Sequence, residues 1–79
     1  MKKYIIALID LDYGENPIYY AKFDDCEGTH PKREKAFVVD ESEADKYVKI
    51  AQDMANKMMV DAFLPVEFAR KAVKMEVND

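Results

Sequence analysis

Residues 3–12, KYIIALIDLD, form a run in which both alternating sets of side chains are apolar. In an extended chain one face carries Tyr4, Ile6 and Leu8, and the other carries Ile5, Ala7, Ile9 and Leu11. An edge strand or a strand with one solvated face would alternate apolar with polar residues. The run therefore predicts a strand in the interior of a sheet.

Two further strands are expected before the middle of the chain. Residues 13–17, YGENP, have turn chemistry, and residues 18–24, IYYAKFD, are rich in β-forming side chains. The simplest pairing is an antiparallel hairpin between this second strand and the first. Residues 25–34 are charged and lack periodicity, which predicts a loop, and 35–39, KAFVV, predict a short third strand.

A long amphipathic helix is expected over residues 41–59. Asp40 can accept hydrogen bonds from the first helical amides, and Glu43, three residues later, completes a capping-box pattern. The apolar side chains then recur at steps of three and four, which places them on one stripe: Ala44, Tyr47, Val48, Ala51, Met54, Ala55, Met58 and Met59. Packing of this stripe against the sheet is expected to hold the helix in place.

The C-terminal part of the chain allows two interpretations. Val66 and Phe68 alternate in one phase, and the last residues alternate in the other, which favours a long strand with a bulge near Lys71-Ala72. The alternative is a short helix from Pro65 to Val73. With the strand, the element order is β-β-β-α-β. This predicts one small α+β domain over residues 1–79, with a mainly antiparallel sheet and one helix packed across one face.

The size and composition of the chain limit the kinds of function that it can have. The chain has 79 residues, a net charge of −4 and one cysteine, so it cannot form an internal disulfide. A small chain without disulfides is typical of a reducing compartment, which predicts a cytoplasmic protein. Asp10 and Asp12 end the N-terminal apolar run before it reaches signal-peptide length, and no run is long enough to span a membrane. The acidic balance disfavours binding to nucleic acid.

The only cysteine and the only histidine lie close together in the stretch DDCEGTHPKREK, residues 24–35. Cys26 and His30, with neighbouring acids, suggest a small metal-binding protein or enzyme as one alternative. Structural zinc sites usually need four ligands with paired Cys or His, and no second pair exists in this chain. Gly28 and Pro31 instead suggest an ordinary turn, so no metal and no cofactor is predicted.

Two groups of residues are candidates for contact with another protein. The acids Asp10, Asp12 and Glu15 lie near the expected hairpin turn, and they could dock on a basic partner. Met58, Met59, Phe63 and Leu64 form an apolar cluster at the end of the expected helix. Methionine-rich clusters fill cores and also form adaptable binding surfaces. The cluster is therefore either core or the surface of a homodimer or partner complex.

A sheet that binds nucleic acid is a second alternative. Bases would stack on aromatic side chains, and the candidates are Tyr4, Tyr19, Tyr20 and Phe23. Arg70, Lys71 and Lys74 would supply a short basic patch on the last strand. Packing beneath the helix is the competing explanation for the aromatic residues.

The segment AFVVDESEADKY, residues 36–47, follows a strand-rich start and joins a short strand to an acidic cap and an amphipathic helix. Over residues 35–55 the chain resembles small accessory proteins of phages and prophages. This resemblance implies a protein that works by binding, including inhibitors of host defence such as anti-CRISPR proteins. No phosphate loop or hydrolase motif occurs in the sequence. We therefore expect a non-enzymatic protein-binding module acting through an acidic or apolar surface.

Overall fold

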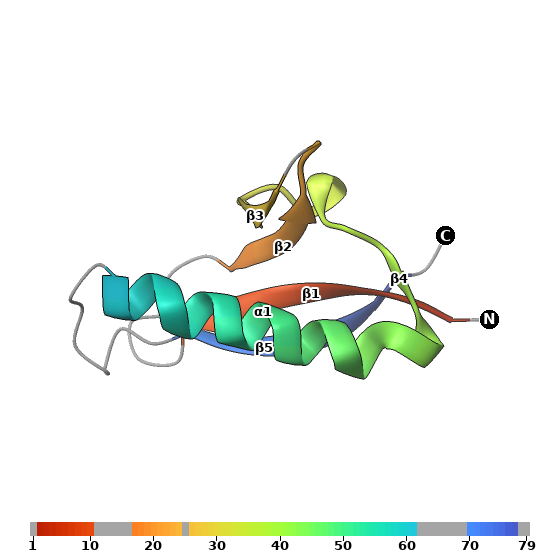
Figure 1. Cartoon of the computed structure of the whole chain (residues 1–79). Coiled ribbons are helices and arrows are strands. Elements are labelled where there is room, and N and C mark those ends of the chain that lie inside the picture. The colour runs from red at the N-terminus through yellow and green to blue at the C-terminus, as the bar shows by residue number, and fades with distance from the viewer. Residues whose placement is uncertain (1, 11–16, 25, 62–69, 78–79) are drawn as a thin grey trace.

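The computed structural model describes residues 2–10, 17–24, 26–61 and 70–77, and for Asp10 and residues 58–61 it describes the backbone alone. The elements in chain order are β1 (Lys3–Asp10), β2 (Ile18–Lys22), β3 (Glu27–His30), the 3-10 turn η1 (Arg33–Lys35), β4 (Val39–Asp40), α1 (Glu41–Asp61) and β5 (Arg70–Val77). The strands form one antiparallel sheet, and α1 lies across one face of it (Figure 1). The predicted α+β class is confirmed.

β1 is the central strand, as its two apolar faces predicted. β5 pairs with it along its whole length, from Lys3↔Val77 to Asp10↔Arg70. β2 pairs with β1 at Ala7 and Leu8, and β4 pairs with it at Lys3 and Tyr4. Because β5 occupies one edge of β1 completely, β2 and β4 pair with the other edge, at different positions along β1.

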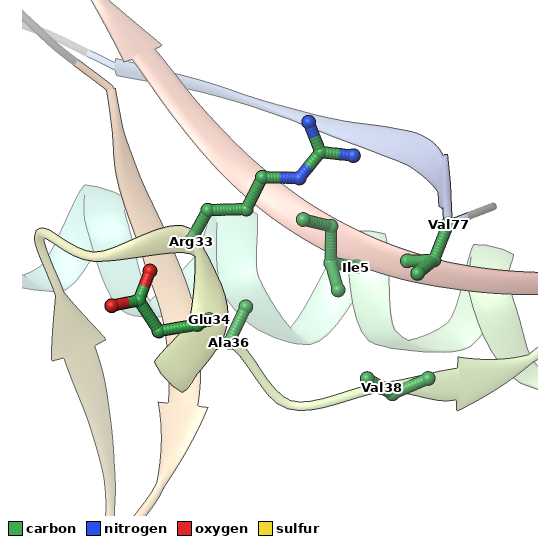
Figure 2. A pocket seen from close by; sticks show the side chains of 6 residues that line it. All are labelled: Ile5, Arg33, Glu34, Ala36, Val38 and Val77. Carbon is green, nitrogen blue, oxygen red and sulfur yellow. The ribbon is translucent and has the colours of Figure 1, made fainter. Parts of the chain in front are cut away.

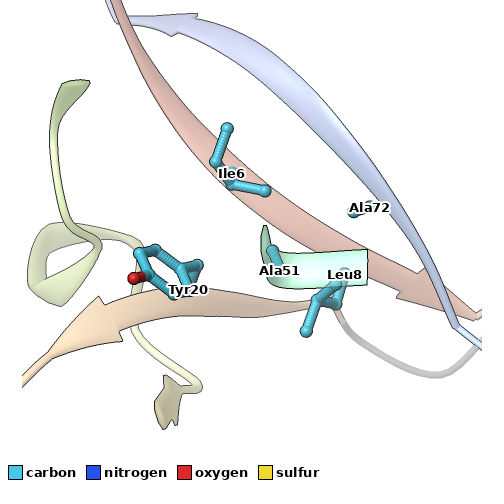
Figure 3. Packing of buried hydrophobic residues seen from close by; sticks show 5 residues of the cluster. All are labelled: Ile6, Leu8, Tyr20, Ala51 and Ala72. Atoms are coloured by element: carbon cyan, nitrogen blue, oxygen red, sulfur yellow. The ribbon is translucent and has the colours of Figure 1, made fainter. Parts of the chain in front are cut away.

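The core lies between α1 and the sheet. Ile6 and Leu8 of β1, Tyr20 of β2, Ala51 of α1 and Ala72 of β5 form the buried cluster (Figure 3). The predicted stripe of α1 faces this cluster: Ala44 and Ala51 are fully buried, and Tyr47, Val48, Met54 and Ala55 are half-buried against it. Small alanines on the helix let it approach the sheet closely, while Tyr20 and Tyr47 fill the wider gap toward β2.

The helix begins at Glu41, directly after Asp40 as predicted, and it ends at Asp61 rather than at residue 59. Glu41 and Glu43 lie in the first turn, where they complement the positive end of the helix dipole. The amide of Glu41 donates to the carbonyl of Lys2, and Lys3 Nζ donates to the carboxylate of Asp40. The start of α1 is therefore fastened to the start of β1.

The prediction of a loop over residues 25–34 is wrong for the middle of this range, because Glu27–His30 form β3. Phe23 and Cys26 exchange backbone hydrogen bonds of 2.8 and 3.4 Å, which closes a tight turn. From this turn β3 pairs with β2 from Lys22↔Glu27 to Tyr19↔His30. Hairpin closure, rather than apolar alternation, makes this strand.

The third strand predicted over residues 35–39 is displaced. Arg33–Lys35 form η1, and only Val39 and Asp40 form β4. The amide of Phe37 donates to the carbonyl of Tyr20 over 2.9 Å, so the segment before β4 is extended but is tied to β2 by that bond. It crosses the opening that β2 leaves as it diverges from β1 (Figure 1).

The bulge predicted near Lys71-Ala72 is also wrong, because the register of β5 on β1 is unbroken. The alternative helix from Pro65 to Val73 is wrong for Arg70–Val73, which are strand, and its earlier part lies outside the described residues. β5 therefore starts at Arg70 and runs through the position of the predicted phase change without a break.

Candidate functional site

Within the described residues, no helix covers the sheet face opposite α1, and we call this face the open face (Figure 1). Ile6, Leu8 and Ala72 point toward the helix, so their neighbours in sequence point to the open face. Strand register extends this assignment from β1 to its partners. The open face therefore carries Ile5, Ala7 and Ile9 of β1, Val73, Met75 and Val77 of β5, and Tyr19, Ala21, Gly28 and His30 of the β2–β3 hairpin. Ile5, Ala7 and Ala21 are nevertheless buried, so only the outer parts of this face are exposed.

A hollow of about 380 Å³ lies on the open face where β2 and β4 leave a gap beside β1. Its lining consists of Ile5, Arg33, Glu34, Ala36, Val38 and Val77 (Figure 2). Ile5 is only 2% exposed and forms the floor, whereas Val38 is 49% exposed and forms part of the rim. An apolar hollow with a few charged groups at its edge is the usual form of a recognition site.

The extended segment before β4 forms one wall of this hollow, because its successive side chains point alternately toward the core and toward the hollow. Phe37 turns inward, where its ring lies 6.2 Å from that of Tyr20 and 5.4 Å from that of Tyr47. Ala36 and Val38, one residue to either side, therefore turn toward the hollow. The aromatic contacts fix the segment and, with it, the position of the exposed Val38 side chain.

The charges around the hollow come from η1. Arg33 reaches across toward Ile5, while the Glu34 carboxylate points away from it (Figure 2). Residues 32–35 are Lys-Arg-Glu-Lys, so three cations and one anion give this exposed segment a net charge of +2. Only Arg33 and Glu34 of this segment line the hollow, so the lining itself is neutral while the flanking lysines make the neighbouring surface basic on a chain whose net charge is −4.

Phe23 is a second exposed apolar residue, with 48% of its surface accessible. It follows β2 at the outer end of the hairpin, and its ring lies over Gly28 on β3. A Cβ atom at Gly28 would come within 2.9 Å of the ring atom Cε2, so glycine makes room for this contact. Phe23 is held in place while its outer side remains open to solvent.

All seven predicted contact residues lie where the structure describes no side chains. Asp12, Glu15, Phe63 and Leu64 lie outside the described residues, and Asp10, Met58 and Met59 are described by backbone alone. Asp10 lies at the end of β1 opposite Arg70, and Met58 and Met59 lie in the last turns of α1. The acidic group and the methionine cluster therefore stay predictions.

The loop with the cysteine and the histidine does not assemble a metal site among the described residues, where no group of three potential ligands occurs. Cys26 is exposed, and His30 Nδ1 accepts a hydrogen bond of 3.0 Å from the amide of Lys32. The two residues are four positions apart along the extended hairpin arm, which separates them by about 13 Å. One ion could not bind both side chains at that separation.

The aromatic residues considered for base stacking are divided between the two faces. Tyr20 is fully buried in the core, and Tyr4 lies on the helix side with Lys74 Nζ 5.4 Å from its ring centre. Tyr19 lies on the open face by its register with Ala7. The structure therefore does not bring these rings together into one platform.

The basic residues of β5 are likewise divided. Arg70 donates to the carbonyl of Leu8 over 3.1 Å, and Lys74 forms an ion pair of 3.0 Å with Asp45 of α1. The Asp45 carboxylate raises the pKa of Lys74 above its ordinary value, which favours the charged form. Lys71, on the opposite face, does not join them, so these residues form no continuous patch.

In the described part of the chain, α1 is not apolar enough to cross a lipid bilayer.

Comparisons with family models, curated proteins and solved structures find no match to this chain. No local pattern in the sequence indicates the hollow, because its lining combines β1, the segment 33–38 and β5. Only Val38, an apolar residue that belongs to no predicted apolar stripe, could have indicated the hollow.

Proposed function

We propose that this chain is a non-enzymatic protein-binding module whose binding surface is the hollow on the open face. The observation that carries the proposal is the exposure of Val38 beside an apolar hollow that is lined by Arg33 and flanked by the basic segment 32–35. Burying the exposed half of a valine side chain favours binding by about 1 kcal/mol, and filling the hollow adds more. Exposure of such residues costs free energy that a partner would recover.

The chemistry of the hollow defines the partner segment. An apolar side chain of the partner would occupy the space above Ile5 and contact Ala36, Val38 and Val77. A carboxylate next to that side chain would bond to Arg33, whose planar guanidinium suits a bidentate contact. The partner is thus a protein segment with an apolar anchor and flanking acids.

The resemblance to phage accessory proteins suggests the setting. We propose that the partner is a host protein and that binding of this chain obstructs its activity, as an inhibitor does. A small binding module can act in this way by covering a surface that the host protein needs. The predicted acidic residues near the first turn would form a separate contact with a basic region of such a partner.

Site-directed cross-linking tests the proposal. Cys26 is the only cysteine, so a Cys26→Ser chain accepts a photo-activated label at one new cysteine, at Val38 or, as the control, at exposed Lys49 of α1. We expect one protein from a host lysate to cross-link at position 38, to be absent at position 49, and to be lost when Arg33→Glu is added. Equal cross-linking at both positions, or no loss with Arg33→Glu, would overturn the proposal.

A further inference from the structure

β5 is an edge strand among the described residues, because it pairs with β1 alone. Gln52 of α1 identifies which backbone groups point outward. Its side-chain amide donates to the carbonyl of Arg70 over 2.9 Å and accepts from the amide of Ala72 over 2.8 Å. Both atoms lie on the outer edge of β5, and outward groups recur every second residue. The amides and carbonyls of Lys74 and Glu76 therefore also point outward.

Gln52 occupies only the first half of this edge. Its amide group imitates the backbone of a neighbouring strand and satisfies Arg70 and Ala72, which is one of the ways in which proteins block an exposed edge. Within the described structure, β5 has no strand beside Lys74 and Glu76. This half of the edge can accept another strand.

We propose that the outer edge of β5 pairs with β5 of a second copy of this chain, antiparallel, about a two-fold axis at Met75. In this arrangement Lys74 lies opposite Glu76 of the second copy, and the same pair occurs again on the other side of the axis. Each pair exchanges both backbone N–H···O=C hydrogen bonds. Each pair also places opposite charges side by side, which stabilises an antiparallel pairing.

Registers with the two-fold axis one residue to either side, at Lys74 or at Glu76, are less favourable than the register at Met75. An axis at Lys74 places two lysines opposite each other and requires the amide of Ala72, which already bonds to Gln52. An axis at Glu76 places two glutamates opposite each other. Like charges at directly opposed positions destabilise a pair. The register at Met75 uses only outward groups that Gln52 leaves open.

The side chains on the open face also fit this register. Val73 lies opposite Val77 of the second copy, and the two Met75 residues lie opposite each other. All three residues are half-buried in one chain, so pairing would cover more of their apolar surface. Because Val77 also lines the hollow, the two hollows of the dimer would be joined by one apolar strip.

The helices permit the arrangement. α1 packs on both β1 and β5, so its axis lies between these strands. Two such axes in the dimer would be separated by about two strand spacings, ~10 Å, an ordinary distance between packed helices. Lys74 has three donor hydrogens and can keep its bond to Asp45 while it contacts Glu76 of the second copy.

A disulfide test reports the register directly. Opposed residues that do not exchange hydrogen bonds have Cα atoms about 4.5 Å apart, within the range for a disulfide. In a Cys26→Ser background, Met75→Cys should oxidise to a covalent dimer, whereas the matched control Val73→Cys faces residue 77 and should remain monomeric on a non-reducing gel. Equal dimer yields for the two variants, or none for Met75→Cys, would overturn the register.

A charge test reports the pairing without a covalent bond. Wild type should have a dimeric mass by light scattering at about 100 μM, and Lys74→Glu and Glu76→Lys should each be monomeric. An equimolar mixture of these two variants places opposite charges at both pairs and should form a heterodimer.

The double variant Lys74→Glu/Glu76→Lys should also recover the dimer, and it replaces the mixture if Lys74→Glu alone does not fold. A monomeric wild type, or single variants that remain dimeric, would contradict the proposal. These masses need no partner protein, so they fail or succeed independently of the proposed function.

Discussion

The side-chain amide of Gln52 accepts a hydrogen bond of 2.8 Å from the backbone amide of Ala72, which lies 20 residues further along the chain. The same side chain donates to the carbonyl of Arg70. One polar residue of α1 therefore secures the helix to the edge of the sheet at the point where β5 begins. In the sequence, Gln52 lies outside the predicted apolar stripe, so the pattern gave no sign of this contact.

Replacement of Gln52 by Ala should lower the free energy of unfolding by about 1–3 kcal/mol, because two part-buried backbone groups lose their partner. Urea titration followed by circular dichroism measures this change. Lys49→Ala, at an exposed position on the same helix, serves as the control and should change stability by less than about 0.5 kcal/mol. Equal effects of the two substitutions would show that the Gln52 contact contributes nothing.

Replacement of Tyr20 by Phe should leave stability unchanged or increase it by about 1 kcal/mol. The Tyr20 hydroxyl is buried and has no hydrogen-bond partner among the described residues. Burial, and after it the nearby Glu27 carboxylate, raises the pKa of Tyr20 far above its ordinary value. Removing an unsatisfied buried hydroxyl removes its desolvation cost while the ring contacts with Phe37 and Tyr47 remain. A clear loss of stability in thermal unfolding would indicate a bound partner for this hydroxyl.

Replacement of Phe37 by Ala should destabilise the fold by about 2–4 kcal/mol, because its ring packs against Tyr20 and Tyr47 and beneath Lys22. Phe37→Leu should recover about half of the loss. Urea titration measures both. The matched control is Val38→Ala, which removes an exposed side chain from the neighbouring position and should cost less than about 0.5 kcal/mol.

The Lys74–Asp45 pair should make stability depend on pH in the alkaline range. The pKa of Lys74 is raised in the folded state, so its contribution is complete below the unfolded value of 10.5 and is lost as the pH rises through the folded pKa. The melting temperature of wild type should therefore fall more steeply between pH 10 and 12 than that of Asp45→Asn. Parallel curves for the two proteins would refute a contribution from this pair.

Loss of the only cysteine should have no effect on the fold and should not change metal content. Cys26 is exposed and makes backbone hydrogen bonds that serine can also make. Elemental analysis of purified wild type should find zinc and iron well below one equivalent, and Cys26→Ser should unfold at the same urea concentration. Stoichiometric metal that is lost with this substitution would restore the Cys26/His30 alternative.

The long elements could be predicted because local pattern and tertiary packing agree in them. β1 has two apolar faces and lies at the centre of the sheet, and α1 has a stripe at helical spacing that lies over the core. β5 was correctly predicted as strand over its last residues, where Val73, Met75 and Val77 alternate. The bulge was wrong because Ala72 packs toward α1 while Val73, Met75 and Val77 alternate on the other face in the same unbroken register, so the strand needs no phase change.

The short elements depend on contacts that the sequence does not display. Residues 27–30, EGTH, have low β-propensity and become a strand only because a tight turn aligns them with β2. Phe37 is a strand former, but its amide bonds to Tyr20 across the opening in the sheet, which leaves only Val39 and Asp40 paired with β1. The hollow exists because of this opening and therefore could not be read from local pattern.

The most direct measurement of the central claim is a chemical-shift map of the chain in complex with the protein captured through position 38. The backbone amides of Ile5, Val38 and Val77 should show the largest changes, and the outward side of α1, at Lys49 and Asp53, should show almost none. Changes centred on α1 or on Cys26 and His30, with the amides around the hollow unaffected, would contradict the assignment of the open face as the binding surface.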